Sequence, residues 1–267
     1  MLRDITLGQY YQTDSVLHRL DPRVKLAGTL LYIISLFFFR NFIGYLIAAA
    51  FLAVVIKLSR VPFKFMVKGM KAILFLLLIT VVFNLFLTPG EPLLSVWKLT
   101  VTKEGLETAV TMAVRLVMLV IGSSVMTLTT TPNNLTDGME KGMRPLKVFK
   151  VPVHEVAMMM SIALRFIPIL LEETDKIMKA QIARGADFES GNLIRRAKAL
   201  VPLLVPLFIS AFRRANDLAM AMEARCYRGG EGRTKMKPLI YQKRDRVAYL
   251  CILFYLVGSI CVGRLLL

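Results

Sequence analysis

Five apolar runs constrain this chain more than any other feature of its sequence. They cover residues 26–39, 42–56, 72–87, 106–130 and 246–266. A helix needs about 20 apolar residues to cross a bilayer, and the first two runs approach that length only with flanking basic side chains that extend to the membrane surface. The chain is 56% hydrophobic, with a mean hydropathy of +0.59. Soluble domains are roughly 45–50% apolar. The sequence therefore predicts an all-α integral membrane protein with about five transmembrane helices.

Basic residues are unevenly distributed between the loops that join these runs. The loop at 57–71 carries five Lys/Arg and no acidic residue, whereas the opposite side has Arg40 and two lysines balanced by two glutamates. Cytoplasmic loops carry the excess of Lys and Arg, so the N-terminus is predicted to be cytoplasmic. This topology divides the chain into a membrane bundle at 1–130, a cytoplasmic helical domain at 131–245 and a C-terminal transmembrane helix at 246–267.

A short pattern occurs twice in the predicted cytoplasmic domain. Ala183-Arg184-Gly185 and Ala224-Arg225-Cys226 each end a long amphipathic stretch. A glycine just past a helix end supplies the left-handed conformation needed there, so Gly185 is expected to end the first helix and Gly229-Gly230 the second. One such arginine is ordinarily explained by the helix dipole. The duplication indicates instead two helix ends that enter similar acidic grooves, because the planar guanidinium binds carboxylates with a fork of donors.

The second amphipathic stretch contains an apolar segment at 199–212 that includes Pro202 and Pro206. Proline kinks a helix because it lacks the N–H group and its ring clashes with the preceding turn. The segment is also short for a bilayer. We expect it to lie against the membrane face, the bundle or a partner rather than to span the membrane.

The net charge of +17 has three common explanations in general, namely nucleic acid, anionic lipid and an acidic protein surface. Nucleic acid is disfavoured because basic and aromatic residues do not alternate and no binding module is recognisable. The sequence also lacks the phosphate-binding loop, HExxH and GxSxG motifs, and its two histidines are not spaced as metal ligands. We therefore expect no catalytic activity, no metal site and no cofactor in this chain.

Polar residues within the apolar runs are few, chiefly Arg115 and Asn84. An intramembrane charge is a functional candidate by default, but a structural contact with a carbonyl or an ion partner explains Arg115 equally well. A self-contained carrier, the alternative function, would show polar residues recurring along several spans or inverted repeats.

Three motifs in this order resemble those of one family, and the resemblance covers nearly the whole chain. LDPRVKL begins at Leu20, ALRFIP at Ala163 is followed by AQIARG, and AMAMEARCYRG begins at Ala219. They are similar to the motifs of the transmembrane T component, EcfT, of energy-coupling factor (ECF) transporters. Within them, Asp21, Arg23 and Arg165 join Arg115 as candidate structural or intramembrane residues.

The resemblance implies a coupling role for the domain at 131–245. Two ABC-type ATPase subunits, which bind Mg-ATP, would each receive one helix end, at Ala183-Arg184-Gly185 or at Ala224-Arg225-Cys226. A small membrane S component would bind the vitamin or other micronutrient, and membrane lipid would surround a complex in the prokaryotic cytoplasmic membrane. A dedicated cobalt or nickel T component is the variant within the family. The family pattern is Ala-Arg-Gly twice, so Cys226 departs from it while leaving the arginine in place.

Overall fold

A computed structural model describes residues 10–39, 41–96, 99–188, 192–229 and 238–265. The predicted position of Arg40 and part of the predicted basic loop, at 230–237, lie outside these residues. The chain divides into two compact units. Among the described residues, the bundle unit comprises 10–142 and 239–265, and the helix-pair unit comprises 143–238.

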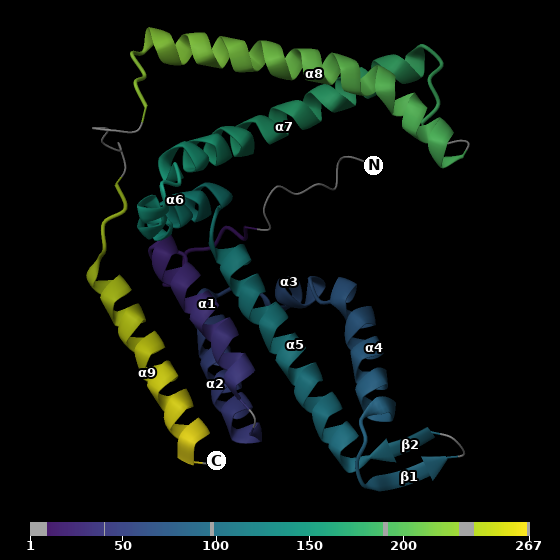
Figure 1. Ribbon diagram of the computed structural model, residues 1–267. Helices are drawn as coiled ribbons and strands as arrows, with labels where there is room; N and C mark the ends of the chain where they lie inside the picture. Colours follow the sequence, from purple (N-terminus) through teal and green to yellow (C-terminus); the bar gives the residue numbers. More distant parts are fainter. Residues whose placement is uncertain (1–9, 40, 97–98, 189–191, 230–237, 266–267) are drawn as a thin grey trace. The chain divides into compact units, whose positions relative to one another are not determined.

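The bundle unit contains a helix at each of the five apolar runs (Figure 1). Its elements are α1 (Pro22–Phe38), α2 (Phe42–Ser59), α3 (Phe63–Lys68), α4 (Lys71–Leu87), β1 (Pro92–Val96), β2 (Leu99–Thr102), α5 (Lys103–Thr129), α6 (Pro132–Gly142) and α9 (Lys243–Leu265). The antiparallel β1–β2 hairpin was not expected from the sequence. α6 packs against α1, so the bundle unit extends into the first residues of the segment 131–245.

The core of the bundle unit lies between α1, α2, α5 and α9. Leu36 and Ala48 are completely buried there, and Phe51 stacks on Tyr255 with ring centroids 4.3 Å apart. The outward faces are apolar as well. On α4, for example, Leu74 and Phe75 are exposed. An outer surface of this kind is stable in lipid and would aggregate in water, which agrees with the predicted membrane bundle.

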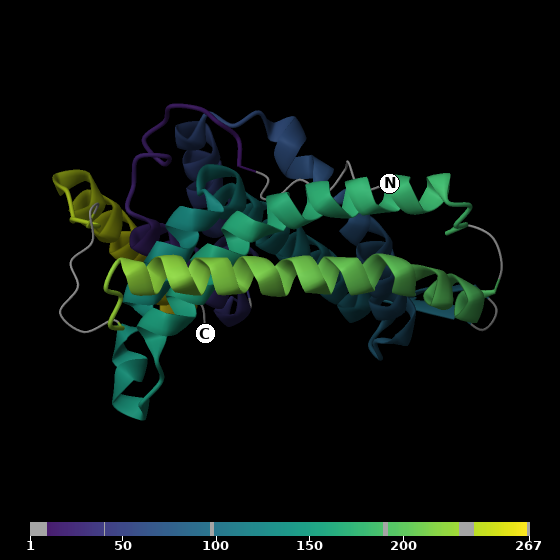
Figure 2. The same cartoon turned by 90° about the horizontal axis from the view of Figure 1, so that it is seen from above.

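The helix-pair unit consists of a short 3-10 helix, η2 (Arg144–Phe149), and two long helices, α7 (Val153–Ala183) and α8 (Leu193–Ala224). The long helices run antiparallel and cross, as the two views show (Figures 1 and 2). Glu173 of α7 accepts hydrogen bonds from Ser210 and from Arg214 Nη2, the latter at 2.9 Å. Because these two α8 residues are one turn apart, one carboxylate joins the helices at their crossing.

Four helices of the described residues are long and apolar enough to cross a membrane, and α4 contributes a shorter apolar helix, Ile73–Leu87. The four are Phe42–Ser59, Lys103–Thr129, Val153–Ala183 and Lys198–Ala224. The last two belong to the helix-pair unit. Their predicted location in the cytoplasm rests on the charge asymmetry of the loops, and it stays a prediction.

Candidate functional site: two arginine-bearing helix ends

The first duplicated pattern ends α7 in a Schellman motif, a turn that closes a helix with two backward hydrogen bonds. Arg184 is the C-cap residue, and Gly185 follows with φ +87°. The amide of Gly185 donates to the carbonyl of Ile182 at 2.9 Å. The amide of Ala186 donates to the carbonyl of Gln181, also at 2.9 Å. These bonds satisfy carbonyls that the helix end would otherwise leave open. The expected role of Gly185 is thus confirmed.

The second pattern ends α8 in the same way. Arg225 is the C-cap residue, and Cys226 takes the left-handed position with φ +56°. The amide of Cys226 donates to the carbonyl of Glu223 at 2.8 Å. The amide of Tyr227 donates to the carbonyl of Met222 at 3.0 Å. The two helix ends therefore share one backbone geometry, although their sequences differ at the left-handed residue.

The second helix ends at Arg225 as expected, but the expectation that Gly229-Gly230 stops it was wrong. The last helical residue of α8 is Ala224, and Gly229, with φ +88°, makes a later turn. The left-handed conformation needed at the helix end is adopted by a cysteine, at a cost that a glycine would avoid. The second motif therefore has Cys226 where the Ala-Arg-Gly pattern has glycine, but its backbone forms the same Schellman turn.

Both arginines are exposed, as are the alanines before them, Ala183 and Ala224. Within the part of the chain that the structure describes, neither Arg184 nor Arg225 has a side-chain hydrogen bond or ion pair. The Schellman turns use backbone groups alone, so each guanidinium keeps all five donors for another molecule. The small alanines leave the helix end narrow beside the guanidinium.

The antiparallel crossing of α7 and α8 separates the two arginines. Gln181, in the last turn of α7, donates its side-chain amide to the carbonyl of Pro202 at 3.3 Å. That carbonyl lacks its usual helical donor, because the residue four positions later is Pro206 and has no N–H. From Pro202, α8 continues to Arg225, a rise of roughly 30–35 Å. The two helix ends thus lie at opposite ends of the pair.

The remaining arginine candidates occupy different surroundings. Arg165 is exposed on α7 and has no partner among the described residues. Arg115 of α5 is partly buried and donates to the hydroxyl of Tyr45 at 2.6 and 2.9 Å and to the carbonyl of Phe39 at 3.5 Å. This is the structural alternative for Arg115, a contact that joins α5 to the end of α1 and the start of α2.

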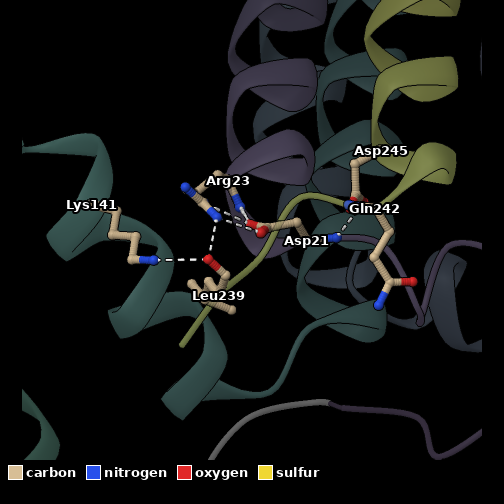
Figure 3. A network of polar contacts seen from close by, with 6 residues as sticks. All are labelled: Asp21, Arg23, Lys141, Leu239, Gln242 and Asp245. Atoms are coloured by element: carbon tan, nitrogen blue, oxygen red, sulfur yellow. Dashed lines mark hydrogen bonds and ion pairs between the residues drawn. The ribbon is translucent and has the colours of Figure 1, made fainter. Parts of the chain in front are cut away.

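Asp21 and Arg23 lie in a polar network at the starts of α1 and α9 (Figure 3). Arg23 binds both carboxylate oxygens of Asp21, at 3.0 and 2.8 Å, and its backbone amide donates to the same carboxylate at 2.9 Å. The carboxylate of Asp245 accepts the backbone amides of Asp21, at 2.9 Å, and of Gln242, at 2.7 Å. Asp21 thus caps the start of α1, and Asp245 caps the start of α9. Asp245 also binds the backbone amide of Asp21.

Leu239 brings a backbone carbonyl into the same network. It accepts hydrogen bonds from Lys141 Nζ at 2.9 Å and from Arg23 Nη2 at 3.1 Å. The chain enters the helix-pair unit after Gly142 and leaves it after Pro238. Asp21, Arg23, Lys141, Leu239 and Asp245, called the junction network below, therefore hold together both points where the chain passes between the units.

The charge on Asp21 is stabilised within this network. Burial acts to raise the pKa of Asp21, but the hydrogen bonds from Arg23 outweigh it, so the pKa lies below its ordinary value. The same hydrogen bond to Asp21 raises the pKa of Arg23. Asp21 is 7% exposed and Asp245 2%, so removing either partner would leave buried polar groups without partners.

Sequence reasoning marked Asp21 and Arg23 but missed Lys141, Leu239 and Asp245. Asp21 and Asp245 are 224 positions apart, and Lys141 and Leu239 are 98 apart. No local pattern joins positions so distant, and a backbone carbonyl has no sequence signature. The acidic residue in the first turn of the last helix was the one available signal, because carboxylates are favoured there.

Known proteins resemble this chain along nearly its full length. A model of the cobalt transport protein (CbiQ) family matches residues 13–236. The energy-coupling factor transporter transmembrane protein EcfT of Clostridium kluyveri is 58% identical over 262 residues, covering 97% of each chain. EcfT of Thermosediminibacter oceani is 52% identical over 97% of this chain and 98% of its own. EcfT of Bacillus subtilis is 48% identical over 92% of this chain and 93% of its own.

Proposed function

We propose a coupling function for this chain, which belongs to the EcfT family of transmembrane proteins of energy-coupling factor transporters. In this function the chain couples two ATPases to a substrate-binding membrane subunit. The chain is a multi-pass membrane protein of a transporter. The finer proposal is that Arg184 and Arg225 each dock into one ABC-type ATPase at the cytoplasmic membrane. Mg-ATP is bound by those partners, and an S component carries the vitamin or other micronutrient.

One observation carries this proposal, the pair of equivalent helix ends at opposite ends of an antiparallel helix pair. An antiparallel pair has an approximate twofold axis between its helices, which relates the α7 end to the α8 end. Two copies of one partner that are related by a twofold axis can therefore each bind one arginine-bearing helix end in the same way. The separation of roughly 30–35 Å leaves room for a separate subunit at each end.

The chemistry of each end suits an acidic groove. Each arginine is exposed and has no partner in the described residues, so docking breaks no internal bond. A guanidinium that enters such a groove can bind carboxylates or carbonyls with several donors at once. When two ATPases close on bound nucleotide, the ends of α7 and α8 move with them.

The junction network supports the transmission of that movement. It holds both connections of the helix-pair unit on α1 and α9, through the carbonyl of Leu239 and the ion pair of Asp21 with Arg23. A displacement of the helix-pair unit then reaches two membrane helices together. We propose that it reorients the S component, which releases its substrate in the cytoplasm.

Arg184→Ala and Arg225→Ala test the docking step. Truncating a buried arginine with a carboxylate partner costs about 3–5 kcal/mol, and about 1.4 kcal/mol is a tenfold change in affinity. Each variant is therefore expected to bind one ATPase a few hundred-fold more weakly, measured by co-purification in mild detergent. Arg184→Lys should recover only part of the loss, because an ammonium lacks the fork.

Arg213→Ala is the matched control, since Arg213 is an exposed arginine on α8 away from the helix end and outside the three motifs. It should bind both ATPases normally. Full ATPase binding by Arg184→Ala and Arg225→Ala would refute the docking role. Equal losses of ATPase binding for Arg213→Ala would show that general surface charge, and not the helix ends, carries the binding.

A dedicated cobalt or nickel T component is the second candidate, favoured by the match to the cobalt transport protein family. The EcfT relatives favour the general component. The membrane subunits that co-purify with the chain decide between them. Several different S components support the general function, and a single subunit with uptake of Co²⁺ or Ni²⁺ alone supports the dedicated one.

A further inference from the structure

An apolar cavity opens into one end of the bundle unit. Its volume is about 280 Å³, near the lower end of the roughly 300–1,000 Å³ of ligand sites. It is bounded by α1, α2, α5, α9 and the segment before α1. Val16, Val54 and Val247 line it and are more than half exposed, so the cavity is open to the surroundings of the bundle.

The cavity lies at the end of the bundle that the loop charges place in the cytoplasm. α1 and α9 contribute their first turns, with residues such as Gly28 and Ala248, and α2 and α5 their last turns, with Leu58 and Thr129. In a membrane protein this depth corresponds to the inner leaflet, where anionic lipids are concentrated.

Among the described residues that line the cavity, two are cations, Lys25 and Arg244, and none is acidic. Lys25 Nζ donates to the carbonyl of Thr129 at 2.8 Å, which holds the ammonium at the end of α5. Nε of Arg244 is buried and has no hydrogen-bond partner in the described part of the chain. The hydroxyl of Tyr32, a lining residue only 4% exposed, also lacks a partner there. Buried donors of this kind call for an acceptor.

We propose that this cavity binds one acyl chain of an anionic phospholipid, with the phosphate against Lys25 and Arg244. The apolar lining suits methylene groups, and the two cations complement the negative head group. The hydroxyl of Tyr32 is a donor for an ester carbonyl deeper in the cavity.

The cavity volume excludes a partner helix as its occupant. A helix with its side chains is about 10 Å wide, so 280 Å³ holds roughly 3–4 Å of its length, the rise of two or three residues. An acyl chain is a single file of methylene groups and enters such a space. Charge favours an anionic head group over phosphatidylcholine, whose phosphate is balanced by its own cation.

Native mass spectrometry of the full chain, purified in detergent with its partner subunits, tests the proposal. Phosphatidylglycerol, phosphatidylcholine and glycerol 3-phosphate are added separately. Each cation near the surface contributes about fivefold to binding of anionic lipid. We therefore expect phosphatidylglycerol to bind at least about fivefold more tightly than phosphatidylcholine, and glycerol 3-phosphate not to bind.

Two variants with matched controls locate the site. Arg244→Gln should lower phosphatidylglycerol binding about fivefold, whereas Arg246→Gln, at an exposed neighbour outside the cavity, should leave it unchanged. Ala248→Phe fills the cavity and should lower the binding of both lipids. Leu253→Phe, on an exposed part of α9 outside the lining, should not.

Four results would overturn the proposal. Equal binding of the two lipids, or unchanged lipid binding by Arg244→Gln, removes the head-group contact. Tight binding of glycerol 3-phosphate shows a site for free phosphate. Loss of a membrane subunit from Ala248→Phe, with lipid binding unchanged, shows a protein contact in place of a lipid.

Discussion

The junction network and the two helix ends use arginine in opposite ways. In the network, Arg23 donates to Asp21 and to the carbonyl of Leu239, and its guanidinium lies 3.9 Å from the centre of the Tyr241 ring. At the helix ends, Arg184 and Arg225 are exposed and have no partner among the described residues. Both sets lie close to helix termini, so position on a helix does not distinguish them.

The difference separates stability from binding. A partnered arginine contributes to the folded state, and its loss leaves buried groups without partners. An exposed arginine at a helix end contributes little to folding and is free for another molecule. Substitutions in the two regions should therefore fail in different assays.

The largest effect is expected from the double variant Arg184→Ala/Arg225→Ala. Neither helix end of this variant can dock an ATPase through its guanidinium, and each end is weakened a few hundred-fold. ATP-dependent uptake in reconstituted vesicles should therefore fall to background. Membrane insertion and thermal unfolding should match the wild type. Uptake at the wild-type rate would mean that both arginines are ordinary helix-end charges.

Asp245→Ala tests the other side of the comparison. It leaves two backbone amides, those of Asp21 and Gln242, without an acceptor. Hydrogen bonds to charged groups contribute about 1.5–3 kcal/mol each, so the free energy of unfolding in detergent should fall by about 3 kcal/mol. Asp217→Ala, at an exposed position on α8, is the control and should change it by less than about 0.5 kcal/mol. An unchanged stability of Asp245→Ala would show that the network is dispensable for folding.

The pH dependence of unfolding probes the ion pair itself. Because the pKa of Asp21 is lowered in the folded protein, the unfolded chain binds more protons near pH 4. The stabilisation is present above about pH 4 and is lost as the pH falls through the lowered native pKa. Denaturant titrations between pH 7 and pH 3 should show this loss, and Asp21→Asn should flatten it. If the free energy of unfolding depends on pH equally in the wild type and in Asp21→Asn, other carboxylates cause the acid sensitivity.

Much of the architecture could be predicted from the sequence because its causes are local. Apolar runs bounded by charges placed α1, α2, α4, α5 and α9, and a glycine after an alanine–arginine pair placed the end of α7. The docking role of the two arginines was also inferred from the sequence, and it stays a prediction.

The junction network could not be predicted because its causes are distant. Asp245 binds the backbone amide of Asp21, although residues 143–238 of the helix-pair unit lie between the two aspartates in the sequence. The end of α8 was expected at Arg225, where it lies, but the residue that makes the turn was misassigned for another reason. Cysteine does not favour positive φ, so the sequence pointed to Gly229 while the structure turns at Cys226.

That substitution allows the finest comparison, between the two helix ends themselves. Cys226 has φ +56° where Gly185 has φ +87°. An L-residue in the left-handed region costs about 1–2 kcal/mol. Glycine avoids this cost, but its more flexible unfolded chain offsets part of the gain in stability. Cys226→Gly should therefore stabilise the protein by about 0.5–1 kcal/mol, and Gly185→Ala should destabilise it by about 1 kcal/mol. Chemical denaturation measures both.

The same pair of variants separates the turn from the side chain that follows the arginine. If the arginine alone makes the contact, Cys226→Gly binds the ATPase as the wild type does, because the Schellman turn places Arg225 in either case. Weaker binding by this variant, with its stability raised as expected, would show that the thiol itself contacts the partner. The two helix ends would then be equivalent in backbone and different in what they recognise.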